Sequence, residues 1–156
     1  MEKYLRLLNP KSTNFDGVSG CSHGALTTAD VCVAMSYAKL TQFQENLIRL
    51  KCLGANTIIN VDMFGRVLLR KYSDQFNQSN VDLEYQVAIV RTALYEFCMV
   101  AGDYKPTERN REVLSGFSDS TVRKHLKNRI DHVLCDLNEE LELAQEKIFF
   151  QLNKSK

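Results

Sequence analysis

The segment from Gly116 to Asn128 carries the side chains of this chain that are best suited to binding a nucleic acid. It reads GFSDSTVRKHLKN, so small hydroxyl side chains come first and basic side chains follow. Hydroxyl groups and the N-terminus of a helix bind phosphate oxygens, whereas arginine, lysine and asparagine bind phosphates or base edges. The side chains predicted to contact DNA are Ser118, Ser120, Thr121, Arg123, Lys124, Lys127 and Asn128.

A helix-turn-helix within residues 107–133 would present these side chains to a DNA groove. Such a motif needs a short helix, a tight turn that often contains glycine, and a second helix with small polar and basic residues at its start. The sequence predicts a helix from Pro106 to Leu114, a turn at Ser115–Ser118 and a second helix from Asp119. The side chains expected to pack the two helices together are Val113, Leu114, Phe117, Val122 and Leu126. The alternative is an ordinary capped, basic surface helix.

The charge of the chain changes sign along its last third. Between Lys105 and Arg129 there are seven Lys or Arg residues and three Asp or Glu residues, an excess of four positive charges. From Asp131 to Glu146 there are six acidic residues and no Lys or Arg, while the formal net charge of the whole chain is +1. A basic block followed by an acidic block can serve two different partners, although two solvated faces of different charge would look the same.

The elements that must position these residues are all predicted to be helical. No period-2 alternation typical of a strand persists anywhere, so the predicted fold class is all-α: a helical bundle with a helix-turn-helix in the C-terminal third and a long C-terminal helix. Residues 1–27 are rich in turn-forming residues and are interpreted as an irregular N-terminal arm. Residues 28–104 are the helical bundle body, and residues 105–156 hold the helix-turn-helix and the C-terminal helix, packed on the body.

Three helices are expected in the body, followed by the helices of the last third. They cover about residues 28–51, 57–76 and 80–102, the third with Asn80 as its N-cap. The expected buried side of the second helix is Ile58, Val61, Phe64, Leu68, Tyr72 and Phe76, and that of the third is Leu83, Val87, Val90, Leu94 and Phe97. The C-terminal helix keeps an apolar line at Ile130, Val133, Leu137, Leu141 and Ala144.

Other chemistry finds little support in the sequence. Five cysteines, an odd number with no CxxC pair, argue against both a disulfide framework and a zinc ribbon. His125 and His132 lie seven residues apart but lack enough neighbouring ligands for a metal site. No P-loop, nucleophile elbow or HExxH motif is present, so we expect no catalytic residues, no cofactor and no small-molecule substrate. Without a signal peptide or an apolar run of spanning length, we expect a cytoplasmic protein with no membrane partner.

Four segments of the chain share their order and residue types with one known family. They are Asn9–Ser12, Leu26–Val31 with the following Ala34 and Met35, Ala93–Cys98, and Phe117–Leu137. In this order the chain resembles the Q late-gene antitermination proteins of lambdoid phages, of the phage lambda type. Leu26–Val31 is similar to the start of that family's first long helix, and Ala93–Cys98 to its aromatic-cysteine helix end. The resemblance touches most of the chain through short motifs.

The chain departs from the family at one place. Members of the lambda type carry two zinc-binding CxxC pairs between the aromatic-cysteine helix and the C-terminal region, whereas here Met99–Val113 contains no cysteine. The resemblance therefore implies a shortened member without zinc, and no zinc-dependent property of the family is expected for this chain.

The resemblance implies a phage transcription antitermination factor acting in the cytoplasm of the bacterial host. Such a protein binds double-stranded DNA in a late promoter, loads onto paused bacterial RNA polymerase, and makes the enzyme read through pauses and terminators. Sigma factor and the elongation factor NusA are further expected partners. We assign polymerase contact to residues 1–27 and 138–153, because a bundle core alone explains neither segment.

Two other functions fit the same residues. One is a conventional helix-turn-helix repressor or activator, which would normally dimerise on a palindrome with half-sites about one helical turn apart. The other is a helical protein-interaction scaffold whose basic helix binds an acidic protein. The scaffold predicts no DNA affinity, whereas the repressor predicts a symmetric complex.

Overall fold

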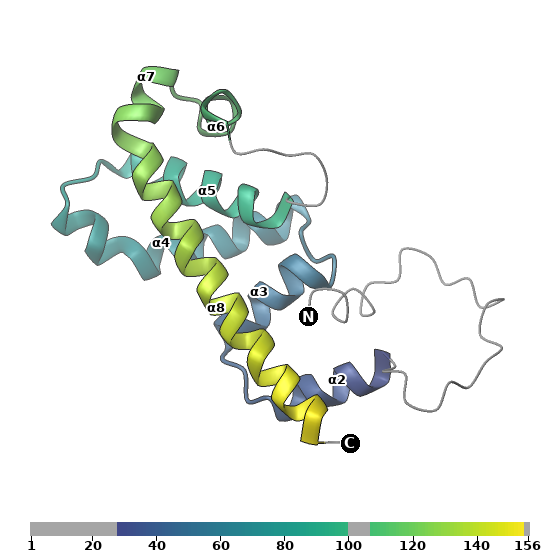
Figure 1. Cartoon of the computed structure of the whole chain (residues 1–156). Coiled ribbons are helices and arrows are strands. Elements are labelled where there is room, and N and C mark those ends of the chain that lie inside the picture. The colour runs from purple at the N-terminus through teal and green to yellow at the C-terminus, as the bar shows by residue number, and fades with distance from the viewer. Residues whose placement is uncertain (1–27, 100–106, 155–156) are drawn as a thin grey trace, which may run out of the picture. The chain divides into compact units, whose positions relative to one another are not determined.

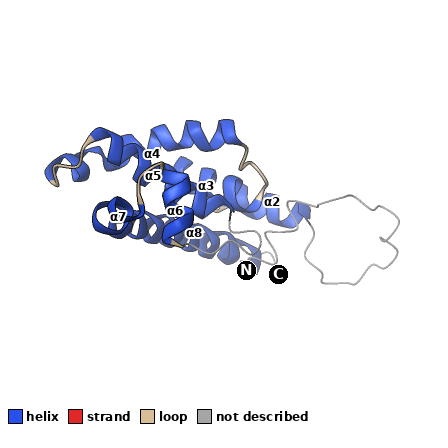
Figure 2. Cartoon of the chain, turned by 90° about the horizontal axis from the view of Figure 1, so that it is seen from above, coloured by secondary structure: helices blue, strands red, loops and turns tan. Residues whose placement is uncertain are grey.

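The structure, a computed structural model, describes residues 28–99 and 107–154. Within these ranges all regular elements are helices and no strand is present (Figures 1 and 2). The prediction of an all-α fold is confirmed. The predicted N-terminal arm, residues 1–27, lies outside the described residues, as does the segment 100–106.

The described residues form two compact units. One contains residues 28–55 and 140–154, and the other contains residues 56–99 and 107–139. Helix α8 (Lys127–Lys154) contributes to both units, since it is continuous across residue 139. The residues predicted to contact DNA all belong to the second unit.

The first unit contains two short helices where the sequence predicted one long helix over residues 28–51. Helix α2 (Thr28–Tyr37) and helix α3 (Gln42–Cys52) are separated by a turn in which Lys39 has a positive φ of 47°. Thr41 starts α3 with a capping box: its hydroxyl accepts the Gln44 N–H at 3.1 Å, and its own N–H donates to the Gln44 side chain at 3.3 Å. The prediction of a single helix is wrong because Thr41 and Gln44 form a Thr-x-x-Gln capping box, which starts a new helix.

Gln44 also joins α3 to α8 within the first unit. Its buried side-chain amide donates to Glu140 Oε2 at 3.0 Å, and its oxygen accepts from Lys147 Nζ at 2.9 Å. The first unit also buries apolar side chains from all three helices, the most buried being Val31, Leu47, Ile48, Ala144 and Ile148. A buried amide is tolerated here because its donor and acceptor groups are both hydrogen-bonded.

Helices α4 (Ile58–Gln78) and α5 (Leu83–Met99) pack side by side in the second unit (Figures 1 and 2). Thr57 caps α4, and its hydroxyl accepts the Asn60 N–H at 3.4 Å. Five of the six residues predicted for the buried side of α4 are buried, namely Val61, Phe64, Leu68, Tyr72 and Phe76. The prediction that Ile58 is buried is wrong, because this residue lies in the first turn of α4 and is 71% exposed.

The buried side of α5 differs from the prediction. Leu83 and Val87 are exposed, at 70% and 42%, whereas Val90, Leu94 and Phe97 are buried as expected. Helix α5 packs against α4 and also against α6 (Glu108–Ser115), so its buried face is wide and includes small and polar residues. These are Gln86, Ala88, Thr92, Ala93 and Glu96. A search for large apolar residues at helical spacing could not recognise such a face.

Helix α5 begins later in the chain than predicted. Asn80 is not the N-cap of α5, because the helix begins at Leu83 and Asn80 lies in the preceding turn with a φ of 49°. Asparagine tolerates this left-handed conformation better than most residues do.

The prediction for α8 is confirmed. All five residues predicted to form its apolar line are buried, namely Ile130, Val133, Leu137, Leu141 and Ala144.

Two glycines of the second unit are predicted to respond oppositely to alanine. Gly65→Ala should raise the free energy of unfolding by up to about 1 kcal/mol, because alanine favours a helix more than glycine does. The new methyl fits, since it would meet Leu94 Cδ2 at 4.0 Å, an ordinary contact distance. Gly116→Ala should lower the free energy of unfolding by about 1 kcal/mol, because residue 116 has a φ of 76°. Chemical denaturation of both variants measures these changes, and shifts of the same sign would contradict the described backbone.

Candidate nucleic-acid interface

The first helix of the predicted motif is α6, which begins two residues later than expected. Thr107 is its N-cap and accepts the Asn110 N–H at 3.2 Å, so Glu108 is the first helical residue. Pro106, where the sequence predicted the start, lies outside the described residues. The helix ends at Ser115, and Gly116 takes the left-handed conformation and donates its N–H to the Glu112 carbonyl at 2.9 Å. Glycine at this position ends a helix without the strain that a side chain would add.

Three predicted DNA contacts come together where the second helix begins. Ser118 is the N-cap of α7 (Asp119–Thr121), and its hydroxyl accepts the Thr121 N–H at 3.4 Å. The same hydroxyl lies 3.1 Å from Ser120 Oγ and 3.0 Å from Thr121 Oγ1. These three residues form a hydroxyl cluster at the positive end of the helix dipole, and such a position favours an anion.

The second helix is continuous from Asp119 to Lys154 through a π-helical turn, η3 (Val122–Leu126), into α8. Val122 and Leu126 are fully buried, as predicted. Phe117, which precedes the helix, is half-buried and packs its ring edge-on against Tyr85 of α5, with ring centres 5.0 Å apart. The His125 ring stacks on the same tyrosine at 6.1 Å. Helix α5 therefore supports the turn and the second helix directly, which the sequence analysis did not foresee.

The packing of α6 differs from the prediction that Val113 and Leu114 would hold it in place. Val113 is 77% exposed and Leu114 is half-buried. The buried residue of α6 is Arg111, only 4% exposed. Arg111 is one of the seven Lys or Arg residues of the basic block, and charged residues are rarely buried unless they are paired.

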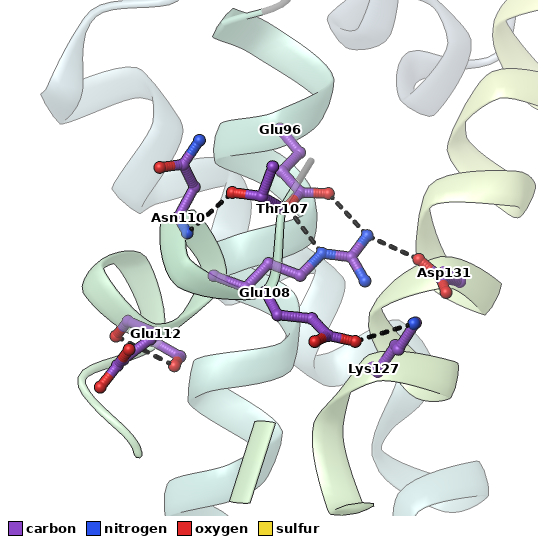
Figure 3. A network of polar contacts seen from close by, with 9 residues as sticks. Glu96, Thr107, Glu108, Asn110, Glu112, Lys127 and Asp131 are labelled. Atoms are coloured by element: carbon purple, nitrogen blue, oxygen red, sulfur yellow. Dashed lines mark hydrogen bonds and ion pairs between the residues drawn. The ribbon is translucent and has the colours of Figure 1, made fainter. Parts of the chain in front are cut away.

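Arg111 is buried where two carboxylates from neighbouring helices meet it, those of Glu96 and Asp131, both of which are labelled in Figure 3. Its Nε donates to Glu96 Oε1 at 2.8 Å and its Nη2 to Glu96 Oε2 at 2.9 Å, while Nη2 also donates to Asp131. Burial lowers the pKa of the guanidinium, but the hydrogen bonds to Glu96 and Asp131 outweigh this effect and raise it. Arg111 therefore stays charged and connects α6 to α5 and α8.

Two of the predicted DNA-binding cations are paired with carboxylates. Glu108, at the start of α6, accepts from Lys127 Nζ at 3.0 Å (Figure 3) and lies 3.2 Å from Arg123 Nη2. Arg123 also pairs with Asp119 at 2.8 Å, one helical turn away. The hydrogen bond from Lys127 and the charge of Arg123 hold the pKa of the Glu108 carboxyl below its usual range. All these groups are at least one-third exposed, so the pairs remain open to competition from solvent and ions.

The remaining two predicted contacts are oriented to the solvent. Lys124 and Asn128 are exposed, and within residues 28–99 and 107–154 neither side chain takes part in an ion pair or hydrogen bond. The seven predicted residues thus fall into three sets: a capping hydroxyl cluster, a cation pair held by carboxylates, and two solvent-facing side chains. Glu108, which joins the first helix to the second, is the functional candidate that sequence reasoning missed. Its position 19 residues before Lys127 gave no local signal.

Comparisons with known proteins add no assignment, because no family model, curated protein sequence or solved structure matches this chain. Among the described residues, no group of three or more His, Cys, Asp or Glu side chains is arranged to hold a metal ion. None of the helices in that part of the chain is long and apolar enough to cross a membrane.

Arg111→Met is predicted to lower the free energy of unfolding by about 3–5 kcal/mol, because it removes the cation that compensates the buried Glu96 carboxylate. Arg109→Met, an exposed change on the same helix, is the matched control and should shift stability by less than about 0.5 kcal/mol. Denaturant titration followed by circular dichroism measures both. A double change, Glu96→Gln with Arg111→Met, should recover part of the loss. Equal effects of the two arginine variants would show that the buried ion pair contributes no stability.

Proposed function

We propose that this chain is a transcription antitermination factor of the phage Q type, acting by binding in the bacterial host cytoplasm. It binds double-stranded DNA of a late promoter, loads onto paused RNA polymerase, and makes the enzyme read through pauses and terminators. The observation that carries the DNA step is the arrangement of α6, the Gly116 turn and the helix from Asp119. The polymerase step rests on the resemblance of the sequence to that family.

The exposed side of the second helix suits duplex DNA in residue type and position. The hydroxyl cluster of Ser118, Ser120 and Thr121 stands at the helix N-terminus, where phosphate oxygens accept hydrogen bonds from hydroxyls and backbone N–H groups. One turn further on, Lys124 is free to bind a guanine edge or a phosphate, and Asn128 to bind adenine. Val122 and Leu126 hold the opposite side in the core. An amphipathic helix with this division matches a recognition helix, whose N-terminal residues contact base edges.

Polymerase contact is assigned to residues 1–27 and to the segment 138–153 of α8. The first lies outside the described residues. The second carries three apolar side chains that solvent reaches, with Leu143 50%, Phe149 38% and Phe150 58% exposed. Exposed aromatic side chains favour a protein partner over DNA, since aromatic residues are enriched in protein interfaces. The partner would be RNA polymerase, sigma factor or NusA.

A protein-interaction scaffold is the second candidate, and one observation favours it. Glu108 and Asp119 already pair with Arg123 and Lys127, which indicates that these cations bind carboxylates readily. An acidic protein would offer the same group. DNA affinity separates the two functions, because the scaffold requires none.

The DNA step is tested by gel shift with a candidate late promoter and a scrambled duplex at two salt concentrations. We expect the protein to prefer the promoter and to lose affinity steeply with salt, because phosphate contacts release counterions. Lys124→Ala should weaken promoter binding by about 1–3 kcal/mol, whereas Arg70→Ala, which removes one exposed positive charge from α4, should have little effect. Absence of binding to either duplex at low salt would leave the scaffold as the surviving candidate.

Phe150→Ser is predicted to reduce terminator readthrough in a purified transcription assay while leaving promoter binding unchanged. A point change is preferred to deletion of residues 138–153, because Leu141, Ala144, Ile148 and Leu152 in that segment are buried in the core. Asn153→Ser, an exposed polar change on the same helix, is the control. A folded Phe150→Ser protein with normal readthrough would contradict the assignment of this surface.

A further inference from the structure

We propose that Glu108 is an intramolecular competitor of DNA phosphate: its carboxylate holds Arg123 and Lys127, and DNA must displace it to use these two cations. This inference rests on the proposed DNA binding and adds a residue that sets its strength. Glu108 lies on the supporting helix α6 and is negatively charged, so a search for basic DNA contacts would not include it.

The geometry makes one carboxylate serve both cations. Glu108 Oε1 accepts from Lys127 Nζ at 3.0 Å, and Oε2 lies 3.2 Å from Arg123 Nη2, so each oxygen has its own cation. Arg123 and Lys127 are one turn apart on the second helix, and Asp119, one turn before Arg123, pairs with it as well. The basic side of the helix that faces Glu108 is therefore already neutralised. The solvent-facing Lys124 and Asn128 are outside this arrangement.

The ion pairs of Glu108 with Arg123 and Lys127 are weak enough for DNA to displace them. The side chains of Glu108, Lys127 and Arg123 are 34%, 43% and 60% exposed, and solvent screening makes exposed ion pairs weak. The hydrogen bond from Lys127 and the charge of Arg123 lower the pKa of the Glu108 carboxyl, because both cations favour its charged form. A carboxylate and a phosphate offer arginine and lysine the same kind of hydrogen bond. DNA can therefore take over both cations, at the cost of their bonds to Glu108.

Glu108→Gln tests the proposal, with Glu112→Gln as the matched control. Both variants remove one negative charge from α6, but no ion pair within residues 28–99 and 107–154 involves Glu112. We expect Glu108→Gln to raise affinity for a fluorescently labelled scrambled duplex about five- to tenfold at low salt, and Glu112→Gln to change it by less than about twofold. The gain should shrink as salt rises, because the pairs are exposed.

A double-variant cycle separates displacement from a general change of charge. Lys127→Ala should weaken DNA binding more in the Glu108→Gln background than in the original chain, because only there is the whole strength of Lys127 available to phosphate. Equal losses in the two backgrounds, or equal gains from the Glu108 and Glu112 variants, would overturn the role of Glu108 while leaving the proposed DNA binding intact. Absence of DNA binding by every variant at low salt would overturn both.

A measurement without DNA checks the same contact in the free protein. In an NMR titration of the glutamate carboxyl groups, Lys127→Ala should move the midpoint of Glu108 upward toward the usual range, because the hydrogen bond that most strongly lowers its pKa is removed. An unchanged midpoint would mean that Lys127 does not hold Glu108 in solution, and would overturn the proposal.

Discussion

The arrangement of the second unit depends on the buried guanidinium of Arg111. Helix α6 has eight residues, and Arg111 is its buried residue, so the helix lacks the apolar stripe that normally holds a helix against its neighbours. Two hydrogen bonds to Glu96 of α5 and one to Asp131 of α8 take the place of that stripe. Such bonds have defined directions, whereas apolar packing has none. They fix the orientation of α6, and with it the turn at Gly116.

This constraint determines how the candidate interface is built. Because α6 is held by polar contacts on its inner side, its first residue, Glu108, stands next to the cations of the second helix. Tyr85 of α5 supports the other side of the turn through the rings of Phe117 and His125. The hydroxyl cluster, the paired cations and the solvent-facing side chains thus share one supporting framework. Substitutions at two charged residues of α6 therefore have different consequences. Loss of Arg111 affects the fold, whereas loss of Glu108 affects the charge that DNA would meet.

The sequence predicted the parts of this protein that depend on local patterns. Periodicity and turn rules predict the buried side of α4, the apolar line of α8 and the glycine at the turn, and the structure contains all three. The break at Lys39 was predictable from Thr41 and Gln44 but was missed. The buried role of Arg111, the Glu108 contact and the wide buried face of α5 depend on residues far apart in the chain. No local pattern encodes them, because the partners meet only when the helices pack.

The π-helical turn η3 sets how the side chains at the start of the second helix are placed around its axis. The buried positions follow steps of four, four and three residues, repeated: Val122, Leu126, Ile130, Val133, Leu137, Leu141, Ala144, Ile148 and Leu152. This is an eleven-residue period of about 3.67 residues per turn. In an α-helix, two successive steps of four would carry the stripe about 80° around the axis. The wider turn, in which the Lys127 N–H reaches back to the Val122 carbonyl, absorbs part of that rotation at the first two steps. The basic side chains at the start of the second helix are therefore fixed in direction around the helix axis relative to Val122, Leu126 and Ile130, the buried residues of the same unit.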